Sequence, residues 1–176
     1  ASGLGKVMAE EAARRGMKVV IADVEAGAME QAVTDLRANG AEAIGVLTDV
    51  TSAASVEALA VTTEECFGPA NLLFNNAGVA SGGPIWESTE KDWKWLFGVN
   101  VDGVANGVRS FTPRMLAAAA ADAAYQGCIV NTASMAGLVT APGMGIYSVS
   151  KHAVLAASEC LYHDLDLIGR RVRAAV

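Results

Sequence analysis

A tyrosine and a lysine stand four residues apart near the C-terminal end of the sequence, as Tyr147 and Lys151. On a helix, residues at this spacing share one face, with Cβ atoms about 5–6 Å apart. A lysine ammonium beside a phenol favours the charged form of the phenol. The pair therefore predicts a tyrosine that gives and takes a proton near neutral pH, as general acid–base chemistry on an alcohol or carbonyl requires.

A serine upstream of this pair extends the same interpretation. Ser134 lies at the end of an apolar, strand-like run, and its hydroxyl can hold the substrate oxygen on which Tyr147 acts. Taken alone, the pair is a weak signal, because short motifs recur by chance. A surface tyrosine packed on a lysine stem in an ordinary helix has the same spacing. The catalytic interpretation therefore depends on the rest of the chain.

The first residues of the chain suggest a place for phosphates. Ser2-Gly3-Leu4-Gly5 passes directly into a helical pattern, and glycines there let a ligand's phosphates approach the free N–H groups of the helix start. Asp23 ends the next strand-like run, about 20 residues after Gly3, where a dinucleotide-binding protein carries the acid that bonds the ribose hydroxyls of NAD. A helix start needs small residues in any case, so the glycines say little without Asp23.

Polar residues follow two further strand-like runs. Asp49 comes after residues 43–47, and Asn76-Ala77-Gly78 comes after residues 71–74. Open α/β sheets bind ligands at the carboxyl ends of their strands. Ordinary turn chemistry is the alternative, since Asp, Asn and Gly also populate turns.

Asn100 falls on an otherwise apolar helical stripe. A buried amide must be hydrogen-bonded, so Asn100 either fixes its helix against a neighbour or serves a proton path. The spacing alone favours the structural role. The stripe comprises Trp93, Leu96, Phe97, Val101, Val104 and Val108.

Helical and strand-like segments alternate along the whole chain and place the residues described above at the ends of strands or on helices. Strands that alternate with helices predict an α/β fold with a doubly wound parallel sheet. Residues 1–176 are expected to form a single domain, and Thr89 with Asp92 is typical of a capping box. Helical patterns cover 5–15, 26–38, about 52–66, a long segment from 89, and 146–168; strand-like runs cover 18–23, 43–47, 71–74, 127–132 and 171–176.

Composition excludes several classes of function. Hydrophobic residues make up 52% of the chain and charged residues only 18%, as expected where many elements are covered on both faces. A net charge of -6 argues against nucleic acid as a partner and provides no basic patch for a membrane. No apolar run is long enough to span a bilayer.

The two histidines have no partner at ligand spacing, so no metal is expected. Three widely spaced cysteines are typical of a reducing, cytoplasmic compartment.

The order and spacing of these motifs resemble the short-chain dehydrogenase/reductase family over nearly the whole chain. That resemblance implies a Rossmann-type NAD(P)-binding domain and an oxidoreductase acting on CH–OH groups. The matching residues are Ser2-Gly3-Leu4-Gly5, Asp23, Asp49-Val50, Asn75-Asn76-Ala77-Gly78, Asn100-Val101-Asp102-Gly103, Ile129 to Ser134, and Tyr147 with Lys151.

The resemblance also implies a role for each motif. Tyr147 resembles the catalytic acid–base, Lys151 the group that assists it and holds the nicotinamide ribose, and Ser134 the group that orients the substrate oxygen. Asn100 would hold a water that links Lys151 to solvent. The cofactor would be bound by Ser2, Gly3, Leu4, Gly5, Asp23, Asp49, Val50, Asn76, Ala77, Gly78, Tyr147 and Lys151.

The chain departs from the family pattern at both ends. The family's glycine motif follows a first strand, whereas here only Gly3 and Gly5 remain and that strand is missing. The chain also stops within residues 171–176, before the family's substrate region. We therefore expect an incomplete domain, a fragment truncated at both ends. In the family's strand order the missing strand is central, so we expect two half-sheets with no ladder between 18–23 and 71–74.

Several functional expectations follow from the resemblance. NAD is favoured over NADP, because the Asp23 carboxylate would repel a 2′-phosphate. Apolar residues near the site favour a hydrophobic secondary alcohol or ketone as the small-molecule substrate. The full-length protein is expected to be a homodimer or homotetramer that pairs through 93–116 and 147–168. The alternatives are a 3-oxoacyl thioester reductase of the same family and a non-catalytic nucleotide-binding protein of the same fold.

Overall fold

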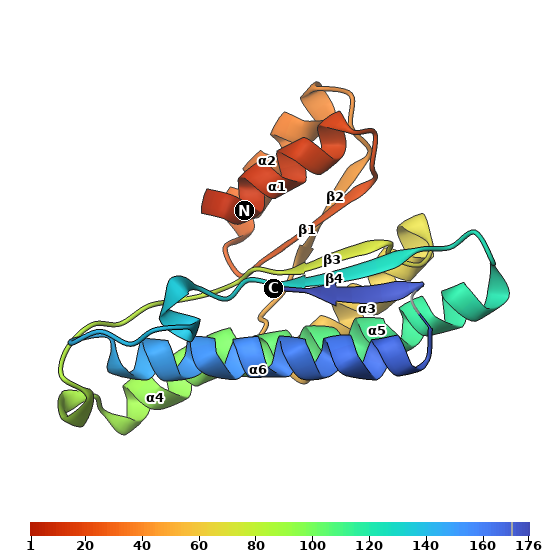
Figure 1. The fold of residues 1–176 in the computed structure, drawn as a ribbon. Helices are drawn as coiled ribbons and strands as arrows, with labels where there is room; N and C mark the ends of the chain where they lie inside the picture. The colour runs from red at the N-terminus through yellow and green to blue at the C-terminus, as the bar shows by residue number, and fades with distance from the viewer. Residues whose placement is uncertain (170) are drawn as a thin grey trace. The chain divides into compact units, whose positions relative to one another are not determined.

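Parallel strands form two separate sheets in the computed structural model, which describes residues 1–169 and 171–176. One sheet belongs to a unit of residues 1–68 and the other to a unit of residues 69–176 (Figure 1). In the described part of the chain, the strand that ends at Asp23 has no ladder to the strand that begins at Leu72, as the sequence predicts. The interpretation of residues 1–176 as one domain stays a prediction.

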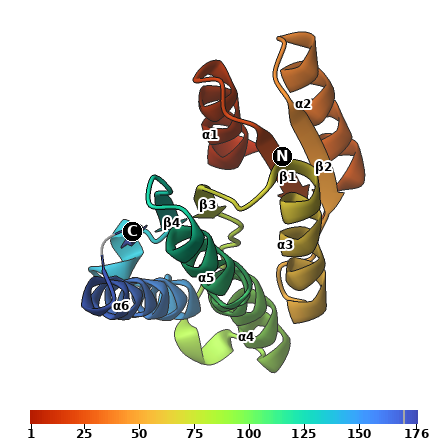
Figure 2. The ribbon, with the colours of Figure 1, turned by 90° about the vertical axis from the view of Figure 1, so that its right-hand side faces the viewer.

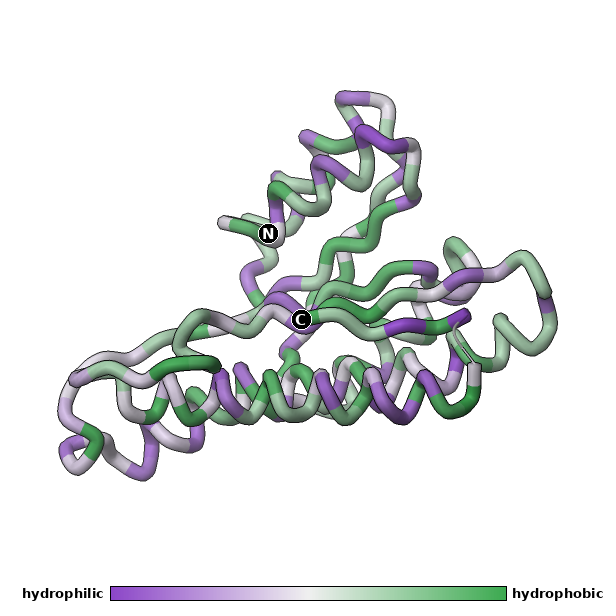
Figure 3. Tube along the Cα trace, viewed as in Figure 1, coloured by the Kyte–Doolittle hydropathy of each residue, from purple (hydrophilic) through white to green (hydrophobic). Residues whose placement is uncertain are grey.

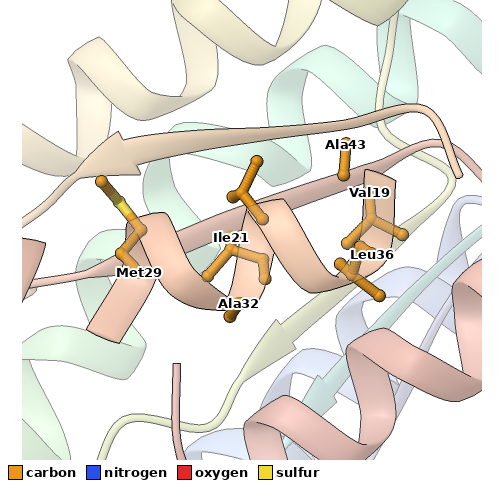
Figure 4. Packing of buried hydrophobic residues seen from close by; sticks show 7 residues of the cluster. Val19, Ile21, Met29, Ala32, Leu36 and Ala43 are labelled. Atoms are coloured by element: carbon orange, nitrogen blue, oxygen red, sulfur yellow. The ribbon is translucent and has the colours of Figure 1, made fainter. Parts of the chain in front are cut away.

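The N-terminal unit is a two-stranded sheet with helices packed on it. Strand β1 pairs with β2 in parallel, with Val19 opposite Ala43. Helix α2 buries Met29 and Leu36 against this pair, at the spacing of one helix face. Figure 4 shows these side chains meeting Val19 and Ile21 from β1. The elements are α1 (Gly3–Arg14), β1 (Val19–Asp23), α2 (Ala26–Ala38), β2 (Ala43–Leu47) and α3 (Ala53–Phe67).

The C-terminal unit is a three-stranded parallel sheet in the order β3-β4-β5. Helices α5 and α6 run along one face of this sheet (Figures 1 and 2). Met115, Ile129 and Leu165 form part of the core between them. The elements are β3 (Leu72–Asn75), η1 (Ile85–Glu87), α4 (Glu90–Phe97), η2 (Gly98–Asp102), α5 (Gly103–Ala121), β4 (Gly127–Asn131), η3 (Met135–Gly137), α6 (Gly145–Leu167) and β5 (Val172–Ala175).

Local sequence signals locate most of these elements correctly. The bounds of α2 and β2 agree with the prediction, and the Thr89–Asp92 capping box forms both of its hydrogen bonds. The strands are mostly hydrophobic, whereas polar residues recur along the helices (Figure 3). In the part of the chain that the structure describes, no helix has the length and hydropathy needed to cross a membrane.

Two helix predictions need correction. Helix α1 begins at Gly3 rather than Gly5, so the glycine segment forms its first turn. The long helix expected from residue 89 is not α-helical throughout, because the π-helical turn η2 separates α4 from α5. Figure 2 shows the three segments continuing as one rod. A π turn accommodates one extra residue, which shifts the helical phase, and such turns are frequent at functional sites.

Candidate active site

Helix α6 brings Tyr147 and Lys151 onto one face, as their spacing predicts. The Lys151 Nζ lies 5.8 Å from the centroid of the Tyr147 ring. Lys151 is only 4% exposed, and its Nζ donates a hydrogen bond to the Thr132 carbonyl oxygen at 2.7 Å. An ammonium has three N–H donors. The bond to Thr132 uses one, which leaves two for a ligand.

Burial sets the electrostatics of Lys151. Its hydrogen-bond acceptor is a neutral carbonyl, and removal from water disfavours the charged ammonium. Burial therefore lowers the pKa of Lys151 below its ordinary value of 10.5. The ammonium thus places a positive charge beside the Tyr147 ring.

Ser134 follows strand β4 and caps the short helix η3. Its backbone is extended, and its Oγ accepts a hydrogen bond from the Ala136 N–H at 3.1 Å. The hydroxyl proton is therefore still available to a substrate oxygen. Helix η3 in turn packs on α6, because a Cβ placed on Gly137 would lie 2.7 Å from the Lys151 carbonyl oxygen. This close approach connects the segment that carries Ser134 to the helix that carries Tyr147.

Replacing Gly137 with alanine is expected to lower the free energy of unfolding by about 1–3 kcal/mol, the usual range for overpacking. The added methyl group would collide with backbone atoms of Lys151, which cannot rotate away. Gly27→Ala is the matched control, since a Cβ there meets no atom within 4 Å. We expect that helical control to be neutral or stabilising. Equal urea midpoints for both variants would contradict the close packing of η3 on α6.

Asn100 lies in the π turn and is 1% exposed. Its Oδ1 accepts the Val79 N–H at 2.8 Å, and its Nδ2 donates to the Val79 carbonyl at 2.9 Å. The same Nδ2 donates to the Ser150 Oγ at 3.0 Å. Asn100 thus fixes its helix to two neighbours, which agrees with the structural role that the spacing favours. The water link implied by the family resemblance stays a prediction.

The segment Asn76-Ala77-Gly78 leaves the carboxyl end of β3 beside these residues. A Cβ on Gly78 would lie 3.5 Å from both the Asn100 Oδ1 and the Lys151 Nζ. The Thr132 Oγ1 donates to the Asn76 Oδ1 at 3.3 Å, which joins the ends of β3 and β4. The structure therefore gathers Asn76, Gly78, Asn100 and Lys151 at one edge of the sheet.

The remaining predicted cofactor residues lie in the N-terminal unit. Ser2, Gly3, Leu4 and Gly5 form the start of α1, and Gly3 has a φ of 50°, which favours glycine. The Ala1 backbone nitrogen contacts the Asp23 carboxylate, so the end of β1 and the start of α1 are adjacent.

The carboxyl group of Asp23 is ionised at neutral pH. Partial burial acts to raise the pKa of Asp23, whereas the hydrogen bond from the Glu25 N–H acts to lower it. The Glu25 N–H donates to the Asp23 Oδ1 at 2.9 Å. The Asp23 carboxylate thus lies beside the residues that precede α1.

Asp49 is exposed and supports a turn. Its Oδ1 accepts hydrogen bonds from the Thr51 N–H and Oγ1, at 2.9 and 2.8 Å. This arrangement agrees with the turn alternative that the sequence leaves open. An adenine contact at Asp49 and Val50 stays a prediction.

Sequence reasoning missed two residues of this site. Thr132 acts through its backbone carbonyl, which no side-chain pattern reveals. Ser150 lies within Tyr147-Ser148-Val149-Ser150-Lys151, and only its complete burial would single it out. Across residues 1–169 and 171–176, no three His, Cys, Asp or Glu side chains gather as a metal site would require.

Comparisons with known proteins agree with this geometry. The family model described as short chain dehydrogenase matches residues 1–176. The chain is 39% identical over 166 residues to a CLA biosynthesis dehydrogenase/reductase of Lactiplantibacillus plantarum, and the match covers 94% of this chain. It is 36% identical over 178 residues to a 1-deoxy-11-beta-hydroxypentalenate dehydrogenase of Streptomyces avermitilis, and that match covers 100% of this chain.

Solved structures give the same result. The chain superposes with a TM-score of 0.94 and 54% identity on a short chain dehydrogenase/reductase from Burkholderia phymatum in complex with NAD, over 98% of this chain. It spans 59% of that protein, 56% of the Lactiplantibacillus relative and 63% of the Streptomyces relative.

Proposed function

Because the chain belongs to the short chain dehydrogenase family, we propose that the protein is an NAD-dependent oxidoreductase that interconverts a secondary alcohol and a ketone. One observation carries this proposal. The Lys151 ammonium is buried, held by the Thr132 carbonyl and placed over the Tyr147 ring, where it can assist proton transfer by the phenol.

The side chains of the site divide the work of such a reaction. In the oxidation direction, the Tyr147 phenolate takes the hydroxyl proton of the alcohol, and in reduction the phenol returns it. Ser134 donates a hydrogen bond to the same substrate oxygen and holds it in place. Lys151 would stabilise the phenolate, and its two remaining N–H donors would hold the ribose beside the nicotinamide.

The residues of this chain fit NAD. Bound NAD supplies the carbon that accepts or returns the hydride. Gly3 and Gly5 leave the N–H groups at the start of α1 open to phosphate oxygens, and the Asp23 carboxylate can accept hydrogen bonds from ribose hydroxyls. Further support comes from the Burkholderia relative, whose structure is a complex with NAD.

An apolar substrate fits the surroundings of Ser134 best. Large hydrophobic side chains are left exposed in the segments that flank the site, where solvent contact is otherwise unfavourable. The name of the Streptomyces relative specifies a hydroxylated substrate, which agrees with an alcohol. The exposed residues are Trp86 (81%), Met135 (70%), Leu138 (64%) and Val139 (58%).

The test is turnover by the full-length protein with NAD and a panel of secondary alcohols of increasing hydrophobic size, followed by NADH absorbance. We expect kcat/KM to rise with apolar size. NAD binding without turnover of any alcohol or ketone would instead favour the non-catalytic alternative. No binding of NAD would contradict the proposal altogether.

NAD is expected to be preferred over NADP by at least tenfold in kcat/KM. A ribose 2′-phosphate would lie beside the ionised Asp23 carboxylate, and like charges repel. A tenfold preference corresponds to about 1.4 kcal/mol. Asp23→Ala should narrow the gap, whereas Glu25→Ala, which removes an exposed charge two residues away, should leave it unchanged. A preference for NADP in the unchanged protein would refute this assignment.

We further propose that the full-length protein is a cytoplasmic homodimer or homotetramer. The three cysteines of residues 1–176 are free, as expected in a reducing compartment. Helices α4 and α6 leave Trp95, Val149 and Tyr162 between 43% and 49% exposed, which is consistent with an interface through these helices. Light scattering at micromolar concentration tests the assembly, and a monomer would count against it.

A further inference from the structure

Ser150 connects two residues of the proposed site through its hydroxyl group. The Ser150 Oγ accepts a hydrogen bond from the Asn100 Nδ2 at 3.0 Å and donates one to the Tyr147 carbonyl oxygen at 2.8 Å. Ser150 is 0% exposed and Asn100 is 1% exposed, so water does not compete for these bonds. The bonds therefore join the π turn directly to the first turns of α6.

The Asn100 amide extends this connection to the loop beyond Gly78. Its Oδ1 accepts the Val79 N–H, and its two Nδ2 protons go to the Val79 carbonyl and to Ser150. The N–H and carbonyl of Val79 together fit only one orientation of the Asn100 amide, because a flipped amide would place an oxygen against the Val79 carbonyl. The Ser150 hydroxyl completes the set of partners that holds Asn100 in this orientation.

We propose that Ser150 is a positioning residue for the reaction. This inference rests on the proposed function, because it concerns the same site. Ser150 acts through the Asn100 amide and the Tyr147 backbone. It fixes the position of Val79, in the loop after Gly78, relative to the first turns of α6. It thereby holds the phenol and Lys151 where proton transfer needs them. A small displacement of a catalytic group slows a reaction strongly, since about 1 Å can lower the rate 10²-fold.

The same helix contains a matched control two turns further on. The Ser158 Oγ accepts a hydrogen bond from the Asn131 Nδ2 at 3.0 Å and donates to the Val154 carbonyl at 2.7 Å. Ser158 is 3% exposed, so it resembles Ser150 in burial and in bonding. Its partner Asn131 bonds to Asn75 within the sheet, rather than to the Val79 loop. Loss of either hydroxyl should therefore lower stability to a similar extent. Only loss of the Ser150 hydroxyl should disturb the proposed site.

The experiment compares Ser150→Ala with Ser158→Ala in the full-length protein. We expect Ser150→Ala to lower kcat by about tenfold, with the KM for NAD changed far less, and Ser158→Ala to leave kcat within about twofold at a similar loss of Tm. Equal losses of kcat in the two variants, or an unchanged kcat in Ser150→Ala, would overturn the proposal.

A second measurement needs neither cofactor nor activity. Hydrogen exchange of the Val79 N–H should speed up in Ser150→Ala and stay unchanged in Ser158→Ala. If the unchanged protein proves to have no dehydrogenase activity, the proposed function fails, while exchange still decides the role of Ser150. If Ser150→Ala does not fold, Ser150→Cys, which nearly keeps the shape but bonds weakly, should show the same effects at smaller size. Unchanged exchange in the cysteine variant would overturn the inference.

Discussion

Replacing Tyr147 with phenylalanine is expected to remove nearly all turnover while leaving NAD binding close to that of the unchanged protein. The substitution takes away one hydroxyl and keeps the ring that lies 5.8 Å from the Lys151 Nζ. A general acid–base group contributes about 10²–10⁴-fold to the rate. The loss should therefore appear in kcat and only weakly in the affinity for NAD.

The control for this substitution is Tyr162→Phe on the same helix. Tyr162 is 49% exposed and takes no part in the site, so its hydroxyl should not affect kcat. Steady-state kinetics measure kcat, and calorimetric titration measures NAD affinity in both variants. If Tyr147→Phe kept more than about a tenth of kcat, far above what loss of an acid–base group permits, Tyr147 would not have this role.

The parts of the fold that depend on local pattern could be predicted from the sequence. Helix α2 repeats the apolar residues Met29, Val33 and Leu36 at helical spacing, so a helix is expected there. The Thr89–Asp92 box marks the start of α4 because both bonds form within one turn. The division into two sheets followed from the family's strand order. The first two signals act over a few residues, whereas the third comes from the strand order of the family.

The interior of the site could not be predicted in this way. The π turn at Gly98–Asp102 has no distinct composition, so the sequence predicts an uninterrupted α-helix there. Asn100 meets Ser150 across 50 residues of chain, and Lys151 meets a backbone carbonyl at Thr132. Such bonds depend on how α6, the π turn and β4 pack together. Periodicity reports which side of an element is buried, but not which polar atoms meet there.

Lys151→Met is expected to damage both turnover and NAD binding, in contrast to Tyr147→Phe. Methionine nearly keeps the length of the side chain but has no N–H donor, so the ribose contact and the cation beside Tyr147 are lost together. Thermal stability should be kept or raised, because burial already disfavours the charged ammonium, as the lowered pKa of Lys151 indicates. A loss of function without a loss of Tm would therefore separate the role of Lys151 from folding.

The same substitution gives a test by pH. Since burial lowers the pKa of Lys151 below 10.5, the ammonium gives up its proton at a lower pH than an exposed lysine does. NAD affinity of the unchanged protein should thus be greatest below that pKa and fall as pH rises through it, and Lys151→Met should lack this fall. Lys94→Met is the control, because Lys94 is 76% exposed and pairs with Glu90 one helical turn earlier. If the affinity for NAD still decreased at alkaline pH in Lys151→Met, another group would bind the ribose.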